Sequence, residues 1–152
     1  MLEINWIRMG VLIVACVAIA IVWGNGQLAR RFADDLVLAL TKAHLGKLPK
    51  GQYSDQYVYT KHMTREQLCM PLDGEKLADM AACTEVARHE SHFDVVSAKA
   101  NANHCSVVLK ATINFEGRRP DGVPVTVRID GAALRAEIER NKDKGWMLTS
   151  LK

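Results

Sequence analysis

The sequence predicts an α+β protein, with one N-terminal transmembrane helix followed by amphipathic helices packed on a curved antiparallel sheet. Three observations lead to this fold class. A run of fifteen residues without a charged or strongly polar side chain, 9–23, lies near the N-terminus. Apolar residues then recur at helical spacing, and from Phe93 the period of the pattern falls to two. The chain therefore divides into an N-terminal tail and anchor, residues 1–24, and one α+β domain, residues 25–152.

Composition excludes several classes of protein. Of the 152 residues, 49% are hydrophobic, which excludes a disordered chain. Only four cysteines are present, too few for a small disulfide-rich fold. A second long apolar stretch is missing from the sequence, which excludes a transporter with many spans. The net charge of +3 comes without an Arg/Lys stripe, so nothing indicates binding to nucleic acid.

The apolar run has the features of a membrane anchor in the lipid bilayer. Trp6 and Trp23 bracket it, where indole rings settle at the two interfaces, and Arg8 lies near enough to one end to reach the headgroups. Gly24-Asn25-Gly26 is expected to end or hinge the helix. Two alternatives are a cleaved signal peptide and a lipoprotein acylated at Cys16, because residues 13–16 look like a bacterial lipobox. We favour the anchor, because the apolar run continues to Trp23 and no small-x-small cleavage site follows it.

Two signals disagree about the orientation of the anchor. Counting Arg8 against Arg30, Arg31 and Lys42 favours a cytoplasmic domain. A short tail followed at once by an apolar run is instead the usual form of an uncleaved signal anchor, whose C-terminal domain is exported. We expect a periplasmic or extracytoplasmic domain, with Arg30 and Arg31 belonging to a folded helix.

Helices are expected in the first part of the domain. Over residues 27–45, apolar residues recur at helical spacing, and Gly46 is a suitable stop. Thr64 and Gln67 match a capping box that opens a short helix. Asp73 is expected to cap another helix that ends near Arg88-His89, so short helices should occupy residues 64–90.

Antiparallel strands are expected over residues 93–151. Alternation over residues 105–115 and 123–129 predicts a hairpin, with residues 93–100 as a preceding strand that bulges at Val95-Val96. Asp130 is expected to cap a short helix through Leu134 and Ile138, before a last strand over residues 146–151. The domain is thus helical first and β-meander second.

This order of elements, with the ending Lys144-Gly145-Trp146-Met147-Leu148-Thr149-Ser150-Leu151, resembles the nuclear transport factor 2-like (cystatin-like) superfamily. The resemblance covers about residues 27–152. It departs from the family pattern at Asp130–Lys144, where a helix replaces a tight final hairpin. Membrane-anchored members of the superfamily include periplasmic inner-membrane subunits of type IV secretion and conjugation machines. Other members are small enzymes or ligand binders built on a conical pocket, and fold analogy does not choose between these roles.

Few residues carry a signal for chemistry. His89-Glu90-Ser91-His92 lacks the spacing of a zinc protease, and we interpret it as a solvated helix end rather than a tetrahedral site completed by Cys83 and Cys105. On an oxidising side of the membrane, a disulfide between Cys69 and Cys83 would join the two short helices; the alternative is that Cys69, Cys83 and Cys105 are all reduced.

The basic pair Arg118 and Arg119 at the predicted hairpin tip is a candidate contact for a protein partner. No catalytic, cofactor or metal motif is recognisable in the sequence. The sequence therefore favours a non-enzymatic assembly or accessory subunit of a membrane-bound or envelope-spanning complex, which contacts other subunits or further copies of itself. The alternative is a small-molecule binder or small enzyme that uses the concave face of the sheet.

Overall fold

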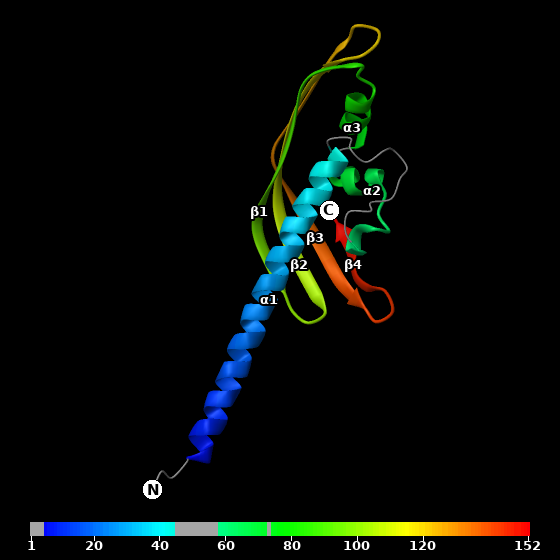
Figure 1. Ribbon diagram of the computed structural model, residues 1–152. Helices are drawn as coiled ribbons and strands as arrows, with labels where there is room; N and C mark the ends of the chain where they lie inside the picture. The colour runs from blue at the N-terminus through cyan, green and yellow to red at the C-terminus, as the bar shows by residue number, and fades with distance from the viewer. Residues whose placement is uncertain (1–4, 45–57, 73) are drawn as a thin grey trace.

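The computed structural model describes residues 5–44, 58–72 and 74–152. Its largest element is helix α1, Trp6–His44, which is 39 residues long. At about 1.5 Å per residue a helix of this length spans roughly 57 Å. Figure 1 shows that only its second half lies against the rest of the chain, while its first half projects away.

The two helical segments predicted around Gly24-Asn25-Gly26 form one continuous helix. The expectation that these residues end or hinge the helix is therefore wrong. Glycine costs only about 1 kcal/mol in a helix interior, and two glycines do not outweigh the helix propensity of the residues on either side. The predicted stop at Gly46 lies outside the described residues.

Within the described residues the strands form one four-stranded antiparallel sheet in the order β1-β2-β3-β4. The strands are β1 (Glu85–Ala100), β2 (His104–Arg118), β3 (Pro124–Asn141) and β4 (Gly145–Leu151). The sheet is a curved, open meander with the C-terminal half of α1 across its inner face (Figure 1). The α+β fold class expected from the sequence is confirmed.

Strand β2 follows the predicted alternation along its whole length. Its inward side chains are all buried, and the register shift in β1 between Val95 and Ser97 confirms the expected bulge. The inward residues of β2 are Cys105, Val107, Leu109, Ala111, Ile113 and Phe115. One apolar face is buried and the other is polar, as in a sheet covered on one side.

The prediction of a helix after Asp130 is wrong, because residues 124–141 form one strand. The Ala-, Glu- and Arg-rich segment has high helix propensity, but pairing with β2 on one side and β4 on the other overrides it. Gly131 adopts φ 64°, and the β2–β3 register shifts at this point. Asp130-Gly131 is therefore a bulge in a long strand and not a helix cap.

The helix expected to reach Arg88-His89 is also shorter than predicted. Helix α3 spans Gly74–Ala81, and β1 begins at Glu85. Asp73, its expected cap, lies outside the described residues. The preceding elements are the 3-10 turns η1 (Val58–Thr60) and η2 (Met70–Leu72) and helix α2 (Arg65–Cys69). The capping box of Thr64 and Gln67 opens α2 as predicted.

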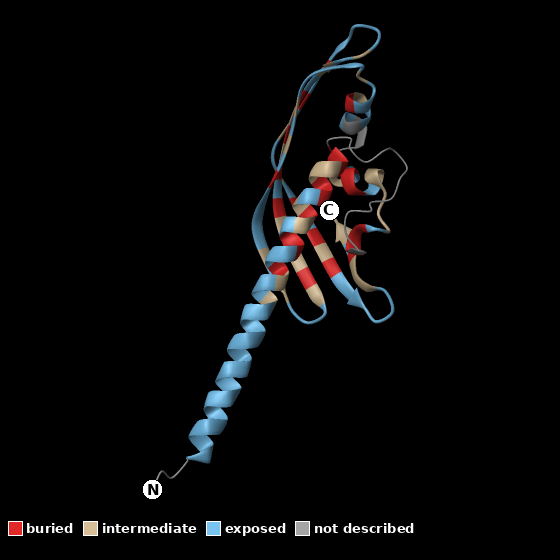
Figure 2. Ribbon diagram, viewed as in Figure 1, coloured by how far each residue is buried: buried red, intermediate tan, exposed pale blue. Residues whose placement is uncertain are grey.

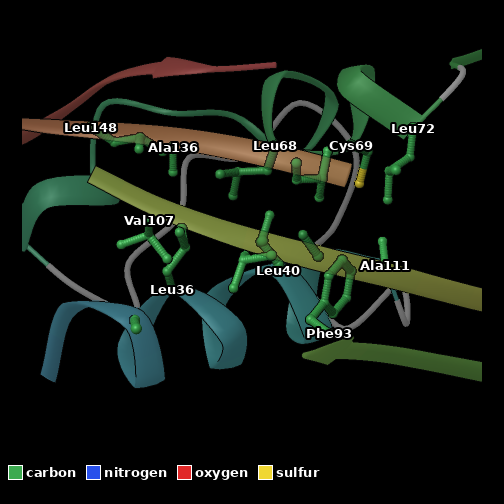
Figure 3. Packing of buried hydrophobic residues seen from close by; sticks show 14 of the residues in the cluster. Leu36, Leu40, Leu68, Cys69, Leu72, Phe93, Val107, Ala111, Ala136 and Leu148 are labelled. Atoms are coloured by element: carbon green, nitrogen blue, oxygen red, sulfur yellow. The ribbon is translucent and has the colours of Figure 1, made fainter. Parts of the chain in front are cut away.

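The core lies between the inner face of the sheet, the C-terminal half of α1 and the short helices. Figure 2 shows that buried residues on α1 begin only where the helix reaches the sheet. Leu36 and Leu40 of α1 point at Val107 and the neighbouring strands, with Leu68 of α2 facing them from the other side (Figure 3). The buried residues of α1 are Ala29, Phe32, Ala33, Leu36, Ala39, Leu40, Ala43 and His44.

Candidate functional site

The first functional feature is the exposed half of α1. An 18-residue stretch within the helix has the length and apolar composition of a membrane span, and none of that stretch is buried. Trp6 and Trp23 are 72% and 69% exposed, and the large side chains between them are also exposed. A helix that is apolar on all sides and contacts no protein is not the core helix of a soluble domain. The chain therefore has one N-terminal helix compatible with a single-pass anchor or a signal sequence.

The concave face of the sheet is filled by the chain's own apolar residues. Phe32 packs its ring against Tyr59, with centroids 5.3 Å apart, and against Trp146, at 5.0 Å. The Tyr59 hydroxyl donates to the Phe32 carbonyl over 3.4 Å, which satisfies its polar end. Among the described residues, the only buried polar or charged residues are His44 and Thr60.

His44 lies at the end of α1 and is 2% exposed. Its ring packs against that of Phe93 in a tilted arrangement, with centroids 5.2 Å apart, and neither ring nitrogen has a hydrogen-bond partner among the described residues. Burial lowers the pKa of His44 to about 4, and the nearby charges of Arg65 and His89 lower it further. His44 is therefore neutral at physiological pH. The sequence pattern offered a signal for its burial, since His44 follows Leu40 by four residues.

His89-Glu90-Ser91-His92 lies in strand β1 and not at a helix end, so that interpretation is wrong. Alternation in the strand separates the four side chains between the two faces of the sheet. Glu90 and His92 face outward, where Glu90 pairs with Arg88 at 2.7 Å and His92 pairs with Asp94 at 2.9 Å.

The inward members of the same motif lie beside the core. The His89 ring lies against Phe115, with centroids 5.2 Å apart, and Ser91 is half-buried. Burial lowers the pKa of His89, partly opposed by a hydrogen bond with the His44 backbone. Within the described ranges no group of three or more His, Cys, Asp or Glu side chains is placed to hold a metal ion.

The cysteines are free thiols in the structure. The predicted disulfide between Cys69 and Cys83 is thus not formed in it. Cys69 is buried at the end of α2, while the half-buried Cys83 donates its thiol to the Asp79 carbonyl at 3.5 Å. Burial raises the pKa of Cys69 and of Cys105 to about 11, so both are protonated at neutral pH. Cys16 is exposed on the apolar half of α1.

The two residues of the predicted basic pair at the β2–β3 turn, Arg118 and Arg119, make different contacts. The Arg119 guanidinium pairs with the Asp79 carboxylate and so ties the hairpin to α3. Arg118 is exposed, and its carbonyl accepts from the Thr84 backbone N–H at 2.9 Å. Of the two residues, only Arg118 keeps a side chain free of the packing between the hairpin and α3.

Sequence reasoning missed another basic cluster, which lies at the end of the sheet opposite Arg118 and Arg119. Arg140, Lys142 and Lys144 are exposed at the β3–β4 turn. The sequence carried no signal for this cluster, because the residues before it were predicted to form a helix and not the strand that places the three side chains at a turn. Arg30 and Arg31 are exposed on α1 as it enters the domain, as expected for residues of a folded helix.

Comparison with family models, with curated proteins and with solved structures finds no match to this chain.

Proposed function

We propose that the chain is a non-enzymatic single-pass membrane protein, whose domain is an assembly or accessory subunit of a membrane-bound or envelope-spanning complex. The observation that carries the proposal is the continuity of α1. One unbroken helix exposes apolar side chains in its first half and buries an apolar stripe in the domain in its second. Such a helix holds the domain at a set distance and orientation from the bilayer, which suits a subunit that presents a surface to its neighbours.

The filled concave face favours a binding subunit over an enzyme or small-molecule binder. A ligand site there needs an open, partly polar hollow. Leu36 and Leu40 of α1, with Leu68 of α2, occupy the corresponding space. His44 has the environment of a core histidine, since it is neutral and packs against the Phe93 ring.

Strand β1 is the surface that best suits a protein contact. It is 16 residues long, lies at the edge of the sheet, and pairs within the described residues only with β2. Its outward side chains form a polar row of Arg88, Glu90, His92 and Asp94. An edge whose backbone groups have no strand partner among the described residues, with a polar and charged outer row, has the hydrogen-bonding and electrostatic features of a specific subunit contact.

The periplasmic or extracytoplasmic location is part of the proposal. Its support is the form of a signal anchor, together with the place of Arg30 and Arg31 within the folded part of α1. The nuclear transport factor 2-like resemblance of the sequence remains part of the proposal. A tight turn joins Asn141 to Gly145, where the sequence had predicted a helix. The resemblance suggests a secretion or conjugation machine as the kind of complex.

The test is to purify the full chain from its native membrane and measure intact complexes by native mass spectrometry. A photo-cross-linking residue at His92 on the exposed face of β1 should give a heteromeric product. The same residue at Leu38, exposed on α1 near the domain, serves as the control position.

Two outcomes of this purification would overturn parts of the proposal. A monomer that carries a co-purified small molecule would refute the subunit function and favour the ligand binder. An intact mass that begins at an acylated Cys16 would replace the anchor with the lipoprotein alternative.

Topology is tested separately with a membrane-impermeant thiol reagent and the variant Ala102→Cys in the exposed β1–β2 turn. Labelling in spheroplasts is expected for an extracytoplasmic domain. Labelling only after lysis would place the domain in the cytoplasm.

A further inference from the structure

The end of the domain that faces the projecting half of α1 carries the chain's excess positive charge. We define this membrane-proximal end as residues 28–34 of α1, 99–104 around the β1–β2 turn and 139–146 around the β3–β4 turn. Figure 1 shows both turns at the end of the sheet from which the exposed half of α1 projects. The backbone N–H of Arg140 donates to the Asn103 carbonyl at 2.8 Å, which holds the two turns together.

The charge of this end is not shared by the rest of the chain. It holds six Lys and Arg against three Asp and Glu, a net charge of +3. The whole chain also has a net charge of +3, so the remaining residues sum to zero. The distal end of the sheet, residues 85–90 and 116–130, holds four basic and five acidic side chains. The basic members of the membrane-proximal end are Arg30, Arg31, Lys99, Arg140, Lys142 and Lys144.

The fold brings this charge close to the level at which the apolar run ends. The ring of Trp146 lies 5.0 Å from that of Phe32, so the start of β4 is level with Phe32 on α1. Phe32 follows Trp23 by nine residues, about 13 Å along a helix. The β3–β4 turn extends up to roughly 10 Å beyond Trp146 toward the exposed half of α1. At this limit the turn comes within a few ångströms of the level of Trp23, where headgroups begin if Trp23 lies at the interface.

We propose that the membrane-proximal end binds the headgroups of anionic phospholipids, an inference that rests on the proposed membrane anchor. The occupant is the bilayer surface itself. Lys142 and Lys144 provide the main contact at the turn, and Arg30, Arg31 and Lys99 contribute from the sides. Each basic side chain near an anionic surface favours the bound arrangement by about five-fold. The continuous helix lowers the entropic cost of this contact, because it already holds the turn near the bilayer.

The β3–β4 turn is built to present its basic side chains. The Asn141 side-chain oxygen accepts from the backbone N–H of Asp143 at 2.8 Å and of Lys144 at 3.3 Å. Gly145 closes the turn with φ 74°. These bonds fix the backbone and leave the lysine ammonium groups in solvent, where they are free to meet phosphate.

The test uses the full chain in nanodiscs of zwitterionic lipid alone or with about 30% anionic lipid. Amide hydrogen exchange is measured along the chain. Residues 140–146 are expected to exchange at least about three-fold more slowly in the anionic discs, and 0.5 M salt should remove the difference because it screens charges at the surface. Nanodiscs present the same lipid on both faces, so the result does not depend on the orientation of the anchor.

A matched pair of variants assigns the effect to this end of the domain. Arg140→Gln, Lys142→Gln and Lys144→Gln together should abolish the lipid dependence. Three exposed basic residues of the sheet, changed together as Lys110→Gln, Arg128→Gln and Arg135→Gln, should leave it intact although they remove the same charge. Exchange of the β2 core amides reports whether each variant is folded.

The same data separate failure of this inference from failure of the anchor. Protection of residues 9–23 in both kinds of disc, without a lipid effect at residues 140–146, would overturn the headgroup contact and leave the anchor in place. Unprotected amides over residues 9–23 would refute the anchor itself. A lipid effect that is equal in both triple variants would also overturn the assignment.

Discussion

Acidification should destabilise the domain through the buried ring of His44. Protonation would place a positive charge between α1 and β1, beside Phe93 and near Arg65 and His89, with no carboxylate among the groups that shift its pKa. The pKa of His44 is lowered to about 4 in the folded chain, from an ordinary value of 6.5. The unfolded chain therefore takes up a proton at a higher pH than the folded chain does, and stability falls as the pH falls.

The size of the effect follows from the difference between the two pKa values. A difference of about 2.5 units corresponds to roughly 3 kcal/mol when fully developed. The contribution is complete above pH 6.5, declines as the pH falls toward 4, and is lost below that. Between pH 7.5 and pH 5 the free energy of unfolding should decrease by about 2 kcal/mol. The lowered pKa of His89 acts in the same direction.

The assay is urea unfolding of the full chain in nanodiscs at pH 7.5 and pH 5, followed by near-UV circular dichroism of the Phe32, Tyr59 and Trp146 cluster. His44→Leu removes the titrating group at similar volume, so most of the pH dependence should disappear. His92→Gln is the control, because His92 lies exposed on the outer face beside Asp94. An unchanged pH dependence in His44→Leu, or an equal loss in His92→Gln, would refute the reasoning.

Four further substitutions test the packing and the strand geometry by the same unfolding measurement. Leu36→Ala empties a fully buried site and should lower the free energy of unfolding by about 2–5 kcal/mol. Leu38→Ala changes a side chain that is 55% exposed and should lower it by less than about 1 kcal/mol. Equal losses in the two variants would contradict the position of α1. Gly117→Ala should cost about 1–3 kcal/mol, because a Cβ there would lie 2.8 Å from the Glu85 carbonyl oxygen, and full tolerance would show that these strands are farther apart. Gly131→Ala should cost about 1 kcal/mol through its φ of 64°, and a stabilised variant would instead support the helix expected from the sequence.

Much of the fold can be predicted where one local pattern has one structural meaning. Strand β2 alternates without competing helical spacing, so each of its buried positions was predictable. The apolar stripe of α1 from Phe32 to Ala43 was equally clear. The Ala133–Arg140 segment was ambiguous, because its apolar residues satisfy both a period of two and a spacing of four. Its residues favour helix locally, and only pairing with β2 and β4 makes it a strand.

The candidate sites divide in the same way. Trp6, Arg8 and Trp23 could be named from the sequence, because the properties of an anchor depend on composition along one segment. Cys69 and Cys83 could be listed, but their thiol state depends on how α2 and α3 pack. Arg119 looked like a contact residue until the fold placed it against Asp79. These outcomes rest on neighbours that are distant in the sequence.

The sequence by itself determined the apolar span, the faces of α1 and β2, and the α+β class, because each depends on periodicity within one segment. Only the tertiary structure decided that the helix continues through Gly24-Asn25-Gly26 and that residues 124–141 form one strand. It also gathered the basic residues of three segments at the membrane-proximal end. For the strand and the basic residues, the physical reason is that contacts between distant segments supply the free energy that overrides weak local preferences.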